Sequence, residues 1–411
     1  MSDNQAYVIV GASLGGAKAA EALRTAGFDG PLVLIGDETE RPYERPPLSK
    51  GYLLGSAERD TIHVHPPGWY EEHDVDLRLG TTVTAIDPSA HEVTLSDGNR
   101  VGYAKLLLTT GSSPRHLPVP GADLAGVHYL RRVADCEQLK ATFQTAARIA
   151  VIGAGWIGLE TAAAARAADV EVIVLEAAEL PLLRVLGPEA AEIFAKLHRD
   201  HGVEMRCGVK VDEITGTGGK VAGVRLGDGN VIRADAVIVG VGITPNVQLA
   251  EAAGLKVSNG ITVDAQLRSS NQDIFAAGDV ASAFHPLLGK HIRVEHWSNA
   301  LNQPPAAARA MLGQDVSYDR VPYFYTDQYD LGMEYSGYVE PGGYDQVVFR
   351  GDVERREFIE FWLRDSRVLA GMNVNIWDVN DAIAALVRSG RPVEVSQLTS
   401  PDVPLQHIID G

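Results

Sequence analysis

Cysteine is nearly absent from this chain of 411 residues, which contains only Cys136 and Cys207. The two are 71 positions apart, so they form neither a CxxC motif nor a metal-ligand spacing. This scarcity argues against a redox-active vicinal disulfide and predicts a reducing, cytoplasmic location. The 12 histidines show no HExxH motif or paired spacing, so a metal site is not expected.

Basic residues are also few, since 36 Lys and Arg stand against 54 Asp and Glu, giving a formal charge of −18. Nucleic acids and anionic membranes require a basic surface, and neither is expected as a partner. No apolar run approaches the roughly 18 residues of a membrane span, and the N-terminus lacks the basic segment of a secretory signal. The composition is otherwise that of a globular protein, and the length predicts two or three domains.

Two glycine-rich turns are present. The first, GASLGG at residues 11–16, follows the apolar run at 7–10, and the second, GAGWIG at 153–158, follows the run at 149–152. In each case a predicted strand leads through glycines into a helix, where backbone N–H groups and the positive helix end bind a pyrophosphate. Two such turns, about 140 residues apart, predict a flavin and a nicotinamide dinucleotide on one chain.

An acidic residue ends the strand that follows each turn. Asp37 comes after the apolar run at 31–35, and Glu176 lies 23 residues after Gly153. A carboxylate at this position binds ribose hydroxyls and repels the 2′-phosphate of NADPH. Because Ala177 and Ala178 supply no cation for that phosphate, the sequence predicts NADH. Such a charge clash is worth about 1–3 kcal/mol, or about 5–150-fold in preference.

The first turn departs from the usual pattern, because Ser13 replaces its second glycine. A serine Cβ fits there if the backbone φ angle is negative, and its hydroxyl can bond a phosphate. The FAD interpretation is retained, and Asp37 at the end of the following strand supports it.

The distribution of strands and helices predicts an α/β fold with two Rossmann-like dinucleotide-binding domains and a C-terminal α+β domain. After residue 320, aromatics, glycine turns and alternating polarity predict an antiparallel sheet, with a late helix near 379–389. The expected domains are an FAD-binding domain at 1–112 and 247–320, an NAD-binding domain at 113–246, and a C-terminal interface domain at 321–411.

Three segments carry a family resemblance: RPYERPPLSK at 41–50, VEHWSNA at 294–300 and MNVNIWD at 372–378. They resemble the FAD-dependent pyridine-nucleotide oxidoreductases of the glutathione-reductase structural class, and most of all the NADH-dependent ferredoxin reductases. The resemblance covers essentially the whole chain. It implies that NADH reduces FAD and that electrons pass singly to a [2Fe–2S] ferredoxin serving a cytochrome P450 or a ring-hydroxylating dioxygenase. The lack of a thiol pair agrees, because flavins can accept a hydride and release single electrons.

The resemblance also implies residue roles. Lys50 would lie near flavin N5 and pair with Glu160 as the catalytic pair, stabilising negative charge on the reduced ring. A purely structural ion pair is the alternative. Asp279 would bind the ribityl chain, and Trp297 would begin a helix directed at the flavin. The expected cofactor-binding residues are Gly11, Ser13, Leu14, Gly15, Gly16, Asp37, Lys50, Val83, Thr110, Gly111, Arg131, Gly153, Gly155, Trp156, Ile157, Gly158, Glu160, Glu176, Gly242, Gly278, Asp279, Glu295 and Trp297.

Some expectations remain open at this stage. Trp156 either covers the flavin until nicotinamide displaces it or packs within the domain, and Glu295 is a candidate contact for the nicotinamide carboxamide. Pro304 and Pro305 should kink or break the helix that begins at Trp297. The acceptor could instead be rubredoxin or monodehydroascorbate, or the chain could be a non-catalytic, NADH-responsive redox sensor with poor turnover.

The surface that would receive an acidic ferredoxin is the least clear feature. Residues 321–411 contain seven arginines, no lysine and fifteen Asp plus Glu, a net charge of −8. Any basic docking patch must therefore be local. The hypothesised patch comprises Arg309, Arg320, Arg350, Arg355 and Arg356, with Tyr323, Phe324, Tyr325 and Tyr329 at its rim.

Overall fold

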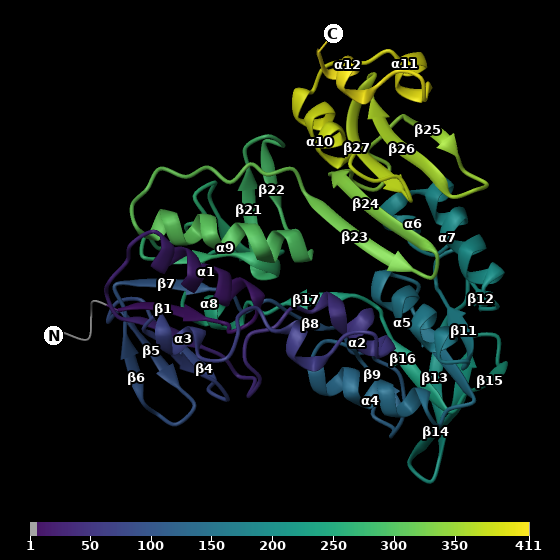
Figure 1. The fold of residues 1–411 in the computed structure, drawn as a ribbon. Coiled ribbons are helices and arrows are strands. Elements are labelled where there is room, and N and C mark those ends of the chain that lie inside the picture. The colour runs from purple at the N-terminus through teal and green to yellow at the C-terminus, as the bar shows by residue number, and fades with distance from the viewer. Residues whose placement is uncertain (1–5, 411) are drawn as a thin grey trace. The chain divides into compact units, whose positions relative to one another are not determined.

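The computed structural model describes residues 6–410, and the chain forms two compact units (Figure 1). Each unit is assembled from three separate stretches of sequence. The chain passes from unit 1 to unit 2 in strand β8 (Ser112–Pro114) and returns in β17 (Ile243–Pro245). Unit 1 comprises the chain up to Arg45, Glu58–Ser113 and Thr244–Arg320, and unit 2 comprises Pro46–Ala57, Pro114–Ile243 and the chain from Val321 onward.

Unit 1 is built on a parallel sheet with the strand order β20-β7-β1-β2-β3. Apart from the edge strand β3, the strands are short, mostly apolar runs, and most of their residues are buried, as expected for a parallel sheet with both faces covered. The first glycine-rich turn joins β1 to helix α1. The bounds are β1 (Tyr7–Val10), α1 (Leu14–Thr25), β2 (Leu32–Ile35), β3 (Val75–Arg78), β7 (Lys105–Leu108) and β20 (Ile274–Ala276).

The remaining elements of unit 1 surround this sheet. Helix α9 (Trp297–Met311) packs against α1, and two small sheets lie in the segments before β7 and around β20. The bounds are η3 (Arg59–Ile62), α3 (Trp69–Glu72), β4 (Val83–Asp87), β5 (Glu92–Leu95), β6 (Arg100–Gly102), α8 (Gln248–Ala252), β18 (Val257–Ser258), β19 (Gly260–Val263), η4 (Gly278–Val280), β21 (Ala281–His285) and β22 (Lys290–Ile292).

Of the expected kink or break at the proline pair, the break is wrong, because α9 runs through both Pro304 and Pro305. Each proline removes one N–H donor from the helix. The helix persists because its surroundings hold it: Gln303 is buried and accepts a hydrogen bond from the Gly278 N–H, and a Cβ on Gly15 of α1 would lie only 3.2 Å from Pro304 Cγ. Tertiary packing here outweighs local propensity.

Unit 2 contains a second parallel sheet, with the strand order β12-β11-β10-β16-β9. The second glycine-rich turn joins β10 to α5, which repeats the arrangement of β1 and α1. The bounds are η2 (Pro46–Ser49), α2 (Gly51–Leu54), β9 (Val127–His128), α4 (Val133–Phe143), β10 (Arg148–Ile152), α5 (Trp156–Ala167), β11 (Glu171–Leu175), α6 (Leu183–Leu186), α7 (Pro188–Asp200), β12 (Glu204–Arg206), β13 (Val211–Thr217), β14 (Lys220–Leu226), β15 (Val231–Arg233) and β16 (Ala236–Val239).

The rest of unit 2 is an antiparallel sheet with the order β23-β24-β27-β26-β25, followed by three helices. The predicted antiparallel sheet and late helix are therefore present, as is the α/β class of the whole chain. Among residues 6–410, no helix is long and apolar enough to cross a membrane. The bounds are β23 (Tyr323–Gln328), β24 (Leu331–Gly337), β25 (Gln346–Asp352), β26 (Glu357–Arg364), β27 (Arg367–Val374), α10 (Asn380–Ser389), α11 (Val395–Thr399) and α12 (Leu405–Asp410).

Candidate active site

The second glycine-rich turn has the geometry of a dinucleotide site. Gly155 is the N-cap of α5, so the first N–H groups of that helix point out of the turn. A Cβ on Gly158 would lie 2.0 Å from the Gly153 carbonyl oxygen, so only glycine allows this close contact of helix and turn. A Cβ on Gly155, by contrast, would meet nothing nearer than the Gly240 carbonyl oxygen at 3.9 Å. The space at this helix end is therefore open to a phosphate.

Glu176 lies beside this turn, at the carboxyl end of β11. Its Oε2 accepts a hydrogen bond from the Ala154 N–H at 2.6 Å, and its Oε1 accepts one from the Ala178 N–H at 2.8 Å. These bonds fix the carboxylate beside the turn, and a carboxylate in this position fits the ribose of a dinucleotide. The residues present thus fit NADH.

The first turn repeats the close contact in unit 1, because a Cβ on Gly16 would lie 2.0 Å from the Gly11 carbonyl oxygen. Ser13 is the N-cap of α1 with a φ angle of −111°, which is the negative value that a serine needs. Asp37 is exposed just after β2. This turn therefore fits a second dinucleotide, with Ser13 accommodated without strain.

The expected cofactor residues divide between the two units, and the sequence did not reveal this division. Lys50 was expected to lie near the flavin together with residues of unit 1, yet it belongs to unit 2. Unit 1 contains Gly11, Ser13, Leu14, Gly15, Gly16, Asp37, Val83, Thr110, Gly111, Gly278, Asp279, Glu295 and Trp297, and unit 2 contains Lys50, Arg131, Gly153, Gly155, Trp156, Ile157, Gly158, Glu160, Glu176 and Gly242.

Within unit 1, the side chains of Trp297 and Glu295 have protein partners. Trp297 begins α9, and its Nε1–H donates to Glu44 Oε2 at 2.8 Å. Glu295 forms an ion pair with Arg293. Glu44 and Arg293 were not singled out from the sequence, since neither contact has a sequence signal of its own.

The buried carboxylate of Glu160 is the centre of a polar cluster in unit 2. Lys50 Nζ donates to Glu160 Oε1, Thr326 Oγ1 donates to the same oxygen at 2.6 Å, and Ser49 Oγ donates to Oε2 at 2.5 Å. Glu160 is only 4% exposed, and Lys50 is the charge that balances it. Both carboxylate oxygens are acceptors in these contacts, and the ammonium group of Lys50 makes one of them charge-assisted. The sequence indicated Lys50 and Glu160 but not Ser49 or Thr326.

Trp156 packs within unit 2. Its ring lies 5.5 Å from that of Phe194 and 5.1 Å from that of Phe324, measured between centroids. Since both neighbours are buried, these contacts favour the packing interpretation of Trp156 over the gating one.

Neither cysteine is placed for thiol chemistry. Cys136 is buried in α4, and burial raises the pKa of its thiol to about 12. Burial also raises the pKa of Cys207. Since the thiolate is the reactive form, both are poor nucleophiles near neutral pH.

The hypothesised arginine patch is only partly available for docking. Arg350 donates to main-chain carbonyls of Leu398, Ser400, Pro401 and Val403, which fastens the segment between α11 and α12. Arg350 therefore has a structural role, and its place in the docking patch stays a prediction.

Arg356 is engaged as well, through ion pairs with Asp200 and Asp330. Of the aromatic residues expected at the rim, Phe324 is buried, and Tyr329 is half-buried and stacks on His201 with ring centroids 3.8 Å apart. Arg355 is exposed and forms an ion pair with Asp352. Arg309 and Arg320 are also exposed, and they line one hollow of about 240 Å³ in unit 1.

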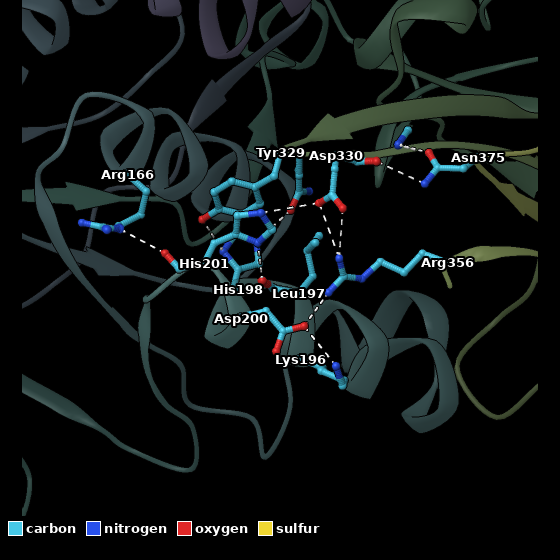
Figure 2. A network of polar contacts seen from close by, with 12 residues as sticks. Arg166, Lys196, Leu197, His198, Asp200, His201, Tyr329, Asp330, Arg356 and Asn375 are labelled. Atoms are coloured by element: carbon cyan, nitrogen blue, oxygen red, sulfur yellow. Dashed lines mark hydrogen bonds and ion pairs between the residues drawn. The ribbon is translucent and has the colours of Figure 1, made fainter. Parts of the chain in front are cut away.

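A second polar cluster surrounds His198 of α7 (Figure 2). The imidazole is fully buried; its Nε2 lies 2.8 Å from Gln328 Oε1, and its Nδ1 lies 3.3 Å from the Tyr329 hydroxyl. Burial lowers the pKa of His198 to about 4. No motif in the sequence distinguishes this histidine among the twelve.

Acidification is expected to destabilise the protein through His198. Between pH 6.5 and 4 the unfolded chain binds a proton at this position and the folded chain does not. The free energy of unfolding therefore decreases as the pH is lowered through this range. The loss approaches about 3 kcal/mol near pH 4. Denaturant titrations at several pH values should show it, and His198→Gln, which keeps a donor but cannot titrate, should flatten the curve. An identical slope in the variant would contradict this assignment.

Comparison with known proteins places this chain in a family that binds two dinucleotides, in agreement with the two glycine-rich turns. Residues 5–304 match the family described as "Pyridine nucleotide-disulphide oxidoreductase", and residues 323–409 match "Reductase C-terminal". The chain belongs to the pyridine nucleotide-disulphide oxidoreductase family. Members of this family, ferredoxin reductases among them, use FAD and NAD(H). The name refers to a disulphide, yet neither Cys136 nor Cys207 of this member is paired.

Relatives within the family are similar over nearly their whole length. Rhodocoxin reductase of Rhodococcus erythropolis is 39% identical over 97% of this chain and 93% of its own. The ferredoxin–NAD(+) reductase component of the anthranilate 1,2-dioxygenase system of Burkholderia cepacia is 42% identical over 97% and 98%. Putidaredoxin reductase, solved in covalent complex with putidaredoxin, superposes with a TM-score of 0.95, 37% identity, and coverage of 99% of this chain and 98% of that one.

Proposed function

We propose that this family member is an NADH-dependent ferredoxin reductase. It would carry electrons from NADH through FAD to a [2Fe–2S] ferredoxin that feeds a cytochrome P450 or a ring-hydroxylating oxygenase. The names and coverage of its relatives support this proposal. Residues 1–112 and 247–320 would bind FAD, residues 113–246 would bind NADH, and residues 321–411 would form the interface domain.

One observation carries most of the proposal: two dinucleotide turns occur on a chain whose two cysteines are unpaired and have raised pKa values. A disulfide relay is therefore not available to Cys136 and Cys207, and electrons would leave directly from the flavin. This arrangement suits a one-electron acceptor. Two unpaired cysteines also support a reducing location, and we propose the cytoplasm.

The residues present would divide the work. Bound FAD supplies hydride acceptance from NADH and the release of single electrons. Glu176 would bind the adenosine ribose of NADH, and the N-terminus of α5 would hold its pyrophosphate. Lys50 would provide a fixed positive charge that offsets the negative charge gained on reduction, and Glu160 would hold Lys50 charged and oriented.

The deciding experiment is NADH-driven reduction of a purified [2Fe–2S] ferredoxin, reported by cytochrome c, with a ferredoxin-free control. We expect a rate that depends on the ferredoxin concentration. The variants Arg309→Glu and Arg320→Glu should lower that rate and leave reduction of the flavin by NADH unchanged. Rapid bleaching of FAD without ferredoxin reduction would contradict the proposed acceptor and favour rubredoxin or a small molecule. Slow turnover with a long-lived reduced complex would favour a sensor.

A further inference from the structure

A run of buried hydrogen bonds in unit 2 connects the Glu160 cluster to strand β23. Thr326 and Gln328 are two positions apart on this strand and therefore point to the same face. Both side chains are buried, at 0% and 1% exposure. Gln328 Nε2 donates to Thr326 Oγ1 at 3.1 Å, and the Thr326 hydroxyl donates its only proton to Glu160 Oε1.

The same run continues to helix α7. Gln328 uses its amide nitrogen on Thr326, so its Oε1 is the acceptor that faces His198 Nε2 at 2.8 Å. The Nε2 of His198 must then carry a proton, and its Nδ1 accepts from the Tyr329 hydroxyl at 3.3 Å. Figure 2 shows the imidazole beneath Tyr329, with His201 stacked on the same ring. The network thus selects one tautomer of His198.

All four bonds donate in one direction, from Tyr329 through His198, Gln328 and Thr326 to Glu160. Turning the Gln328 amide round would take the only Thr326 proton away from Glu160 Oε1, and reversing the Tyr329 bond would require a second proton on His198. The amide of Gln328 is not an acid in the physiological range, so the series does not conduct protons. It is a row of aligned dipoles that ends on one oxygen of Glu160.

We propose that Thr326, Gln328 and His198 are positioning residues for the Lys50–Glu160 pair. The Thr326 hydroxyl occupies a lone pair of Glu160 Oε1, the oxygen that Lys50 also contacts, while Ser49 occupies Oε2. The carboxylate is thereby held in one rotamer and shares its charge among three donors, so Lys50 is oriented but not fully neutralised. The inference rests on the proposed function, because the orientation of Lys50 affects turnover only if Lys50 serves the flavin.

The first test is Thr326→Val in the full-length, FAD-loaded protein, a nearly isosteric change that removes the hydroxyl. Stopped-flow reduction by NADH should show a limiting rate about tenfold lower, with the NADH dissociation constant unchanged. Thr326→Ser, which keeps the hydroxyl, should recover most of the rate. The matched control is Thr399→Val in α11, where the hydroxyl bonds only main-chain carbonyls. Equal limiting rates for Thr326→Val and wild type would overturn the proposal.

A second test does not depend on turnover. Side-chain ¹⁵N shifts should show His198 as the neutral tautomer protonated at Nε2. The variant Gln328→Met, which fills the space but removes the acceptor, should abolish that preference and slow hydride transfer in the same direction as Thr326→Val. A wild-type imidazole protonated at Nδ1 would contradict the bond directions. This variant also carries the test if Thr326→Val fails to fold.

Double variants separate this inference from the proposed function. In a Glu160→Gln background, Thr326→Val should slow hydride transfer no further, because it acts through Glu160. If Thr326→Val still slowed hydride transfer tenfold in that background, it would act independently of Glu160, and the proposal would be overturned. If Lys50→Met and Glu160→Gln themselves leave hydride transfer unaltered, the proposed role of the pair is wrong and the positioning role falls with it. If they slow the step but Thr326→Val does not, only the positioning role is wrong.

Discussion

Replacing Lys50 by methionine is expected to lower the limiting rate of hydride transfer from NADH by about 100-fold or more. Methionine keeps the length of the side chain but removes the positive charge, and the loss of one preorganised group that stabilises developing charge typically costs about 10²–10³ in rate. FAD content and NADH affinity should not change, since Glu176 and the glycine-rich turns are untouched. Single-turnover absorbance of the flavin after rapid mixing with NADH measures the effect.

The same substitution leaves the Glu160 carboxylate buried without its cation, which should cost about 3–5 kcal/mol of folding free energy. The double variant Lys50→Met/Glu160→Gln removes both charges and should regain stability without regaining rate. The control is Lys140→Met, which removes a lysine of the same unit whose Nζ lies 4.3 Å from the Tyr52 ring. The pair would be merely structural if Lys50→Met lowered stability, the double variant restored it, and both variants kept a fast rate of hydride transfer.

The preference for NADH over NADPH is expected to fall by about 5–150-fold when Glu176→Gln is combined with Ala177→Arg. The amide removes the charge that repels the 2′-phosphate, and the arginine supplies a donor for it. Glutamine is chosen over alanine because Glu176 also accepts from the N–H groups of Ala154 and Ala178, and an amide oxygen can retain one of these bonds.

The ratio of kcat/KM for the two nucleotides measures this preference. Ala177→Arg by itself should move the ratio much less, because the carboxylate remains. A double variant that loses activity with NADH and gains none with NADPH would show that Glu176 acts through the shape of the turn and not through its charge.

The sequence predicted the parts of the site that have local signatures. Both turns, with the acids that follow them, come from strand, turn and helix in direct succession, so spacing was sufficient. The Lys50–Glu160 contact spans 110 positions and was expected only from the family resemblance. Thr326 joins Glu160 across 166 positions, and nothing in its neighbours marks it. Such contacts depend on packing between distant elements, which a single sequence does not reveal.

Arginine use shows the same limit. A count of charges suggested Arg350 and Arg356 as surface cations, but Arg350 binds main-chain carbonyls and Arg356 bridges two aspartates. The proline pair in α9 shows a different limit of sequence-based prediction. Proline does disfavour the interior of a helix, but the close packing around Gln303 and Pro304 outweighs that preference. The composition therefore limits how many basic residues a docking surface can contain, but it does not show which of them are available on the surface.

The interleaving of the two units constrains how the chain can be made. The polar cluster of unit 2 takes Lys50 from Pro46–Ala57, Glu160 from Pro114–Ile243 and Thr326 from the chain after Val321. During synthesis from the N-terminus, the Glu160 carboxylate is therefore without its Thr326 partner until about four-fifths of the chain has been made. A ribosome-bound or truncated fragment ending before β23 would leave Glu160 incompletely bonded, so this site matures among the last parts of the protein.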